Sequence, residues 1–145
     1  MDGIEELQNV MIVAATNRPD RLDEAFVRNG RISHFIYIPL PDIDTREEIL
    51  RLQMKNRAVS EDFDYKYLAS KTEGYSGAEI VNVCNEAALQ LLAEDIESKS
   101  PVFTLRHMDN ALKSIVPRTT SEMLHFYQNF SAKYGSRSFS NKGDN

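Results

Sequence analysis

The sequence predicts an α/β remnant, two strands of a parallel sheet, followed by an α-helical bundle of four to five helices. Two observations support this prediction. Apolar, β-branched runs occupy residues 10–16 and 34–38, which is the pattern of short buried strands. Beyond Asp42, apolar residues recur at helical spacing instead. The chain therefore divides near residue 42, and two strands alone cannot form a stable sheet.

Five segments after Asp42 have the apolar spacing of helices. Asp44 or Thr45 can cap the first of them, and Ser76 can cap the third and longest. Tyr67 and Leu68 are expected to point inward from the second. The first expected helix contains residues 49–54. The other four are expected over residues 64–71, 78–97, 105–116 and 121–134.

The composition narrows the classes of function. A net charge of -5 argues against a nucleic-acid-binding surface as the main function. No stretch approaches the roughly 20 apolar residues that a membrane-spanning helix needs. The one cysteine, Cys84, cannot form an internal disulfide and fits the apolar stripe of the long helix. Cytoplasmic residence, with the nucleus as the alternative, is therefore the default.

Four segments carry a resemblance to a known family. They are, in chain order, AATNRPDRLDEAFVRNGR, IYIPLPD, TREEILRLQ and GYSGAEIVNVCNEAAL. In this order and spacing the chain resembles the second half of a classical AAA ATPase module, over about residues 1–134. The valosin-containing-protein-like group is the nearest type. Within it, the chain is most similar to the spermatogenesis-associated, diazaborine-resistance branch that is linked to ribosome maturation.

This resemblance implies a division of the chain into four parts. Residues 1–42 correspond to the C-terminal end of the AAA+ α/β core, with two strands of its parallel sheet. Residues 43–118 correspond to the helical lid, and residues 119–134 to a C-terminal helix. The polar tail, residues 135–145, has the composition of a disordered segment.

The resemblance also implies catalytic roles for three residues. Asn17 matches the sensor-one residue, a neutral amide that can orient the attacking water near the γ-phosphate. Arg28 and Arg31 match the arginine fingers, which reach the γ-phosphate of a neighbouring subunit. The alternatives are a turn asparagine and two solvated surface arginines. Asn29 departs from the proline usual in the family, so the finger loop can be less rigid.

Four further residues match positions that contact the nucleotide. Gly77 and Ala78 match the small lid residues that lie against base and ribose, where a bulky side chain would block approach. Ile49 and Gln53 match lid positions that contact adenine, and their spacing of four places them on one helix face. The alternatives are a simple helix start for the first pair and core packing for Ile49.

Several residue types lack the partners that chemistry would need. Glu79 and Glu86 lie two turns apart, so a solvated or ion-paired face is favoured over a catalytic pair. His34, His107 and His125 are scattered without ligand spacing, so no metal site is expected. The sequence has no G-x-x-x-x-G-K-[ST] loop and no strand ending in Asp-Glu for magnesium.

The implied parent is therefore a hexameric ATPase that uses ATP with Mg²⁺ to remodel or disassemble protein complexes. Its partners would be identical or neighbouring AAA subunits and a polypeptide substrate, with pre-ribosomal particles as one candidate. Neither nucleic acid nor membrane is expected as a direct partner. This chain alone is expected not to hydrolyse ATP and to bind no cofactor tightly. The alternative is a non-catalytic helical interaction module, or a truncated product, that docks on AAA hexamers.

Overall fold

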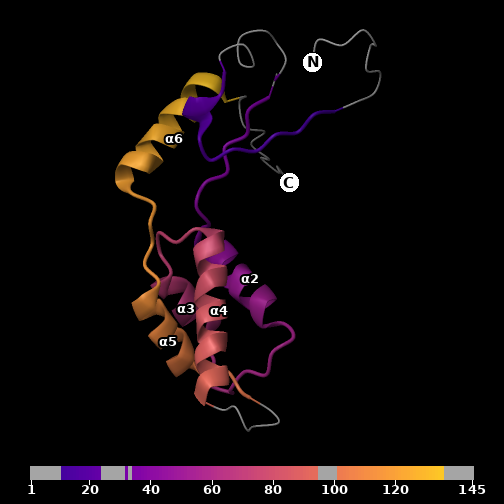
Figure 1. Ribbon diagram of the computed structural model, residues 1–145, viewed down its shortest axis with the longest axis vertical. Helices are drawn as coiled ribbons and strands as arrows, with labels where there is room; N and C mark the ends of the chain where they lie inside the picture. Colours follow the sequence, from indigo (N-terminus) through magenta and orange to yellow (C-terminus); the bar gives the residue numbers. More distant parts are fainter. Residues whose placement is uncertain (1–10, 24–31, 33, 95–100, 136–145) are drawn as a thin grey trace, which may run out of the picture. The chain divides into compact units, whose positions relative to one another are not determined.

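A computed structural model describes residues 11–23, 32, 34–94 and 101–135 of the chain. The chain divides into two compact units, one of residues 1–36 with 130–145 and one of residues 37–129. The elements within the described residues are the 3-10 turn η1 (Pro19–Arg21) and the helices α2 (Ile43–Met54), α3 (Tyr65–Lys71), α4 (Gly77–Glu94), α5 (Leu105–Ser114) and α6 (Ser121–Tyr134) (Figure 1).

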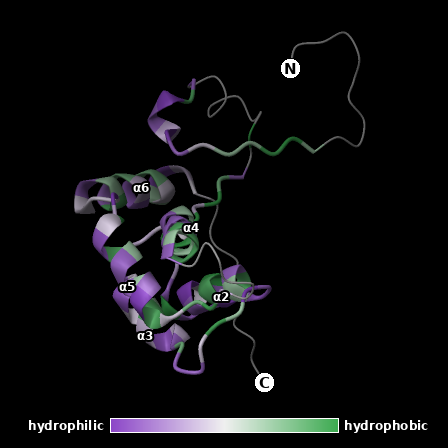
Figure 2. Cartoon of the chain, turned by 60° about the horizontal axis from the view of Figure 1, so that its bottom comes forward, coloured by the Kyte–Doolittle hydropathy of each residue, from purple (hydrophilic) through white to green (hydrophobic). Residues whose placement is uncertain are grey.

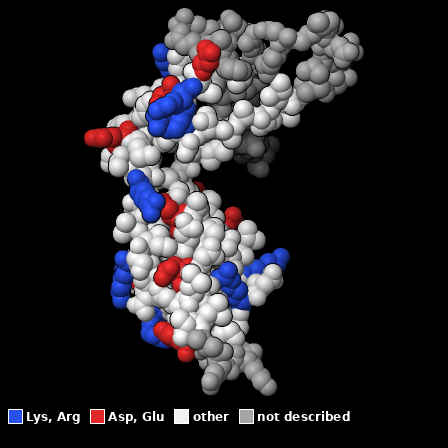
Figure 3. Space-filling view, viewed as in Figure 1, with Lys and Arg blue, Asp and Glu red and all other residues white. Residues whose placement is uncertain are grey.

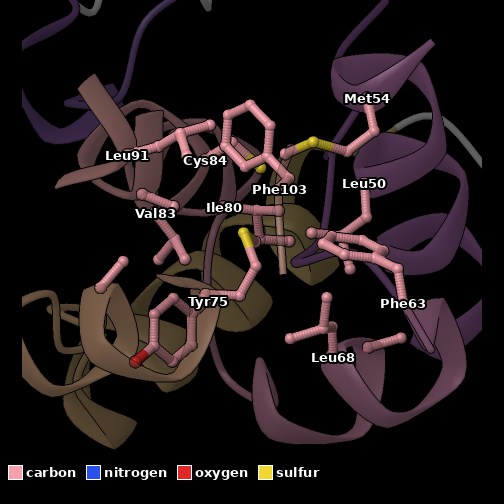
Figure 4. Close-up of a cluster of buried hydrophobic side chains, with 14 residues drawn as sticks. Leu50, Met54, Phe63, Leu68, Tyr75, Ile80, Val83, Cys84, Leu91 and Phe103 are labelled. Atoms are coloured by element: carbon pink, nitrogen blue, oxygen red, sulfur yellow. The ribbon is translucent and has the colours of Figure 1, made fainter. Parts of the chain in front are cut away.

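The unit of residues 37–129 is built around α4. This helix packs against α5 and α2, and α2 in turn packs against α3. Figure 4 shows side chains from these helices, with Phe63 and Phe103 from the connecting segments, meeting in one cluster. Leu50, Leu68 and Ile80 are completely buried there. Each such side chain contributes about 1.5–3 kcal/mol relative to leaving it in water. The predicted helical bundle is thus confirmed.

Cys84 belongs to this core, as the sequence predicts. Its side chain is fully buried. Burial raises the pKa of its thiol to about 11, with the nearby Arg57 guanidinium acting in the opposite direction. A thiol so held stays protonated at neutral pH and behaves as a small apolar side chain.

The helix starts show one correction to the sequence prediction. Asp42, not Asp44 or Thr45, caps α2, since its carboxylate accepts a hydrogen bond of 2.8 Å from the Thr45 N–H. Asp44 lies inside the first turn, where its charge still faces the positive end of the helix. Asp64 caps α3 in the same way as Asp42, accepting from the N–H groups of Lys66 and Tyr67.

Two predicted inward positions are also different in the structure. Tyr67 is 37% exposed, and its hydroxyl donates to the Asp109 carboxylate at 3.2 Å. Leu92, placed by its spacing on the apolar stripe of the long helix, is 56% exposed. The Tyr67 hydroxyl thus finds its partner near the surface, and Leu92 lies outside the buried side of α4 although Leu91 beside it is buried.

The two predicted strands are not confirmed. Within the described residues, β-type pairing is limited to an isolated parallel bridge between Val59 and Phe103. Residues 11–16 and 34–38 are described without strand structure. A strand must exchange backbone hydrogen bonds with a neighbour, and the described part of the chain offers these segments none.

Apolar side chains of these two segments are left uncovered. Met11 and Val13 are 86% and 80% exposed, and Ile36 and Ile38 are 86% and 84% exposed. Figure 2 shows the first of these segments as a green stretch before the 3-10 turn. These side chains therefore gain little from burial within the part of the chain that the structure describes.

Aromatic rings join residue 35 to the end of α6. The Phe35 ring centroid lies 6.3 Å from both the Phe130 and the Tyr134 ring centroids. In the other unit the rings of Tyr37 and Tyr127 stack, with centroids 6.4 Å apart. Across the described residues, no helix is both long and apolar enough to cross a membrane.

Candidate nucleotide-contact site at the start of α4

The structure brings two of the predicted nucleotide-contact residues together. A Cβ added at Gly77 would lie 3.6 Å from Ile49 Cδ1, so the start of α4 is in van der Waals reach of α2. Gly77, Ile49 and Gln53 are half-buried, and Ala78 is exposed. Gln53 follows Ile49 by one turn of α2. Small and half-buried residues from two helices therefore meet at one surface.

The backbone before α4 is held in a tight turn. Gly74 adopts a φ of 80°, a conformation that side chains with a Cβ rarely take. Ser76 then begins the helix, as the sequence predicts, because its carbonyl accepts from the Ile80 N–H at 3.1 Å. Its own N–H and hydroxyl both donate to Glu79 Oε2 at 2.8 Å. In return, the Glu79 N–H donates to the Ser76 hydroxyl oxygen at 3.4 Å, and this reciprocal arrangement is a capping box.

Glu79 has more partners than sequence reasoning assigned. The sequence favoured a solvated or ion-paired side chain, whereas its Oε1 accepts from the backbone N–H of Arg118 at 2.8 Å. Burial alone would raise the pKa of the Glu79 carboxyl, but hydrogen bonds from Ser76 and Arg118 lower it on balance. Arg118 lies 39 positions further along the chain, so no local sequence pattern predicts this hydrogen bond.

The predicted catalytic residues are not tested by this geometry. Asn17 is exposed and lies in the N-terminal unit, next to the ion pair between Arg18 and Asp20 (2.7 Å). Arg28 and Arg31 lie outside the described residues, as does Asn29. Their roles stay predictions from the sequence.

A metal site has no support among the side chains that the structure describes. No group of three His, Cys, Asp or Glu residues gathers there. His107 is buried for a structural reason instead: its Nδ1 accepts from the Thr104 N–H at 3.1 Å, and its Nε2 lies 3.2 Å from Glu94. A ring nitrogen that accepts is unprotonated, so Nε2 carries the hydrogen and donates to Glu94.

An open hollow on the surface lies between α3 and α5. Its volume is about 410 Å³, and it is lined by Tyr67, Lys71, Tyr75, Asp109, Leu112 and Lys113. Three of these side chains make hydrogen bonds within the protein: Tyr67 donates to Asp109, the Lys113 ammonium donates to Asn110, and Tyr75 donates to the Ile115 carbonyl.

The charge pattern of the helical unit is mixed. On the face shown in Figure 3, basic and acidic side chains alternate over its described residues. Arg51 pairs with Glu47 at 2.6 Å and Arg106 pairs with Glu94 at 2.5 Å. On this face, the two signs of charge thus lie close together.

Comparison with known proteins gives two family matches. Residues 1–40 match the model of the ATPase family associated with various cellular activities (AAA), and residues 62–102 match the AAA+ lid domain. The human ATPase family gene 2 protein homolog A is 49% identical over 93% of this chain. The ATPase family gene 2 protein of Saccharomyces cerevisiae is 45% identical over 95% of it, and the Cell division cycle protein 48 homolog of Archaeoglobus fulgidus is 40% identical over 88%.

The chain corresponds to 15%, 18% and 19% of the lengths of these three relatives. Among solved structures, the crystal structure of the FIGL-1 AAA domain is similar, with a TM-score of 0.72 and 28% identity over 83% of this chain and 43% of that one. The same domain in complex with ADP has a TM-score of 0.71. The chain therefore belongs to the AAA ATPase family and corresponds to the C-terminal part of its ATPase module, including the lid.

Proposed function

We propose that the start of α4 and the facing side of α2 form the lid side of an ATP site. In this proposal Gly77 and Ala78 lie against base and ribose, and Ile49 and Gln53 contact adenine. The observation that carries it is the approach of Gly77 to Ile49 Cδ1, 3.6 Å from the position of an added Cβ. The similar FIGL-1 AAA domain has been crystallised with ADP, which supports a nucleotide as the ligand.

The remaining roles in this proposal come from the N-terminal unit. Asn17 acts as sensor one of the chain's own site, and Arg28 and Arg31 act as fingers in a neighbouring subunit's site. We place the domain boundary near residue 42, and the match of residues 1–40 to the AAA model supports this choice. The whole assembly is a hexamer that remodels or disassembles protein complexes with ATP, and pre-ribosomal particles are one candidate substrate.

The chain by itself is expected to be inactive. Its sequence contains no phosphate-cradling loop and no strand ending in Asp-Glu, so neither phosphates nor magnesium have their usual ligands. Base and ribose contacts alone support an affinity no tighter than about 1 mM, equivalent to roughly 4 kcal/mol. The proposal therefore predicts weak ADP binding and no ATP hydrolysis.

Backbone NMR of the labelled chain tests the lid contacts. Millimolar ADP is expected to move the amide resonances of Gly77 and Ala78 and the Ile49 methyl resonance. Asn85 and Leu89, exposed further along α4, serve as internal controls that stay in place. Ala78→Glu is expected to abolish the shifts, because a carboxylate there repels the nucleotide's charge. Shifts confined to other helices, or absent altogether, would refute the nucleotide-contact assignment.

The finger roles need an intact ring. The chain is added in excess to a purified hexamer of the yeast ATPase family gene 2 protein, which is 45% identical to it over the matched residues. The wild-type chain is expected to change the ATPase rate, and Arg28→Ala is expected to change it differently. Equal effects of the two chains, or no effect of either, would remove Arg28 from the proposal.

One observation favours a second candidate, a non-catalytic helical interaction module. The unit of residues 37–129 closes its own core, with fourteen buried apolar side chains gathered in one cluster. A self-contained bundle can dock on AAA hexamers without any nucleotide. Binding of the chain to the ring with an unchanged ATPase rate would favour this candidate over the first.

A further inference from the structure

Two residues at the start of α4 bind a segment that lies about 40 positions further along the chain. The Tyr75 hydroxyl donates to the Ile115 carbonyl at 2.6 Å. The Glu79 carboxylate accepts from the Arg118 N–H at 2.8 Å. Residues 115–118 are the first part of the connection between α5 and α6, and we refer to them as the linker. Tyr75 and Glu79 thus attach the linker to α4 at two points.

The Tyr75 attachment is partly buried and the Glu79 attachment is exposed, and each has one feature that strengthens it. The Tyr75 side chain is only 6% exposed, so water competes weakly for its hydroxyl. The Ile115 carbonyl belongs to the residue that ends α5, and such carbonyls have no partner within their own helix. The Glu79 bond involves an ionised acceptor, and charge-assisted bonds of this kind are about twice as strong as neutral ones.

One carboxylate therefore connects the helix start to the linker. Glu79 Oε2 accepts from the N–H and hydroxyl of Ser76, while Oε1 accepts from Arg118. Gly77 and Ala78 lie between Ser76 and Glu79 in the same turn. Their backbone position consequently depends on both ends of this bridge, one local and one distant.

Glu79 is unsuited to a catalytic role. Three donors already occupy its two oxygens. Glu86, the other acid on this side of α4, accepts from Gln90 at 3.2 Å and does not reach Glu79 with any hydrogen bond that the structure describes. The role that remains for Glu79 is to hold the backbone of Ser76 and Arg118 in place.

We propose that Tyr75 and Glu79 are positioning residues that couple Gly77 and Ala78 to the linker that leads into α6. A displacement of the linker then moves the turn that holds the proposed base and ribose contacts. The inference rests on the proposed function for its relevance to nucleotide binding. The coupling itself is a property of the helical unit and is measurable without nucleotide.

The first test removes the linker's donor. Arg118→Pro deletes the N–H that binds Glu79, and Arg118→Ala keeps it while removing the same charge. In NMR spectra of the complete chain, Arg118→Pro is expected to shift the Gly77 and Ala78 amide resonances, and Arg118→Ala is expected to leave them nearly in place. Equal spectra of the two variants at these amides would overturn the coupling.

The second test follows the ionisation of Glu79. In the wild-type chain, the Arg118 amide resonance is expected to titrate with the Glu79 carboxyl. In Glu79→Gln this titration is expected to vanish while the helix content, read by circular dichroism, stays the same. An Arg118 amide that titrates identically in both chains would overturn the bond and the proposal with it.

Tyr75→Phe keeps the proposal testable if Arg118→Pro does not fold. This variant loses one hydroxyl and is expected to increase amide exchange across residues 115–118. Tyr67→Phe is the matched control, because it loses a hydroxyl that binds Asp109 and not the linker. Equal exchange of the linker in both variants would contradict the role of Tyr75.

Adding millimolar ADP separates the two proposals. If ADP moves the Gly77 resonance in the wild type and also the Arg118 resonance, but only Gly77 in Glu79→Gln, both proposals are supported. If ADP moves neither residue in any chain, the nucleotide contact fails, and the amide comparisons above still decide the coupling. If ADP moves Gly77 but never Arg118 in the wild type, the coupling fails alone.

Discussion

The two units of this chain differ in how far they cover their own apolar residues. In the helical unit, Leu50, Leu68 and Ile80 are completely buried. In the N-terminal unit, Met11 and Ile36 are each 86% exposed, although the local sequence is as apolar. A helix makes its backbone hydrogen bonds within itself and needs a neighbour only to cover its apolar stripe. A strand needs a partner for its backbone as well, so the same apolar content yields a core in one case only.

The largest expected effect comes from the core of the helical unit. Leu50→Ala should lower the free energy of unfolding by about 2–5 kcal/mol, because the cavity it leaves is surrounded by packed side chains. Urea unfolding followed by circular dichroism measures it. Leu52→Ala, on the same helix but 68% exposed, is the control, with an expected change within about 0.5 kcal/mol. Equal losses would show that this core is not what stabilises the chain.

A smaller effect is expected at a helix start. Asp64→Ala should cost about 1 kcal/mol of unfolding free energy, because the N–H groups of Lys66 and Tyr67 lose their acceptor. Asp62→Ala changes an exposed carboxylate in the same loop that caps no helix, and it should cost much less. The same denaturation experiment compares them. An equally large loss of unfolding free energy in Asp62→Ala would show that the effect comes from charge and not from capping.

Acid should reveal the contribution of Glu79. Its pKa in the folded chain lies below the ordinary glutamate value of 4.5, because hydrogen bonds outweigh the opposing effect of burial. Its stabilising contribution is therefore complete above pH 4.5 and is lost as the pH falls through the lowered pKa. At neutral pH, the free energy of unfolding of the wild type should exceed that of Glu79→Gln by about 1 kcal/mol, and this difference should close in acid. A gap independent of pH would contradict this.

The smallest effect is expected from removing residues 1–36. A chain cut to residues 37–145, which keeps α6 whole, should unfold with a free energy within about 0.5 kcal/mol of the complete chain, because exposed residues such as Met11 and Ile36 contribute little burial. Differential scanning calorimetry of both chains measures the difference. A large loss would mean that the helical unit depends on its neighbour, and the comparison drawn above would fail.

Local patterns predicted the elements that depend on local forces. The Ser76 cap, the burial of Cys84 and the position of the five helices all follow from spacing within a few residues. The position of the first cap was wrong by two residues, because Asp42, Asp44 and Thr45 are all good caps and only the backbone decides among them.

Contacts between distant residues were beyond such patterns. The bonds from Glu79 to Arg118 and from Tyr75 to Ile115 span 39 and 40 positions, and neither has a periodic signal. Glu79 therefore looked like one more charged residue on a helix surface. The site residues Gly77 and Ile49 were singled out by resemblance to a family, and their closeness in space became visible only in the structure.

The space beside Gly77 has a practical consequence. A methyl group there would rest on Ile49 at an ordinary contact distance, and Gly77 has a φ outside the left-handed region. The bundle itself thus has no need of a bare backbone at this point. Gly77→Ala should therefore fold without loss of structure. Any binding or activity that this variant loses then reports on an outside molecule that approaches the helix.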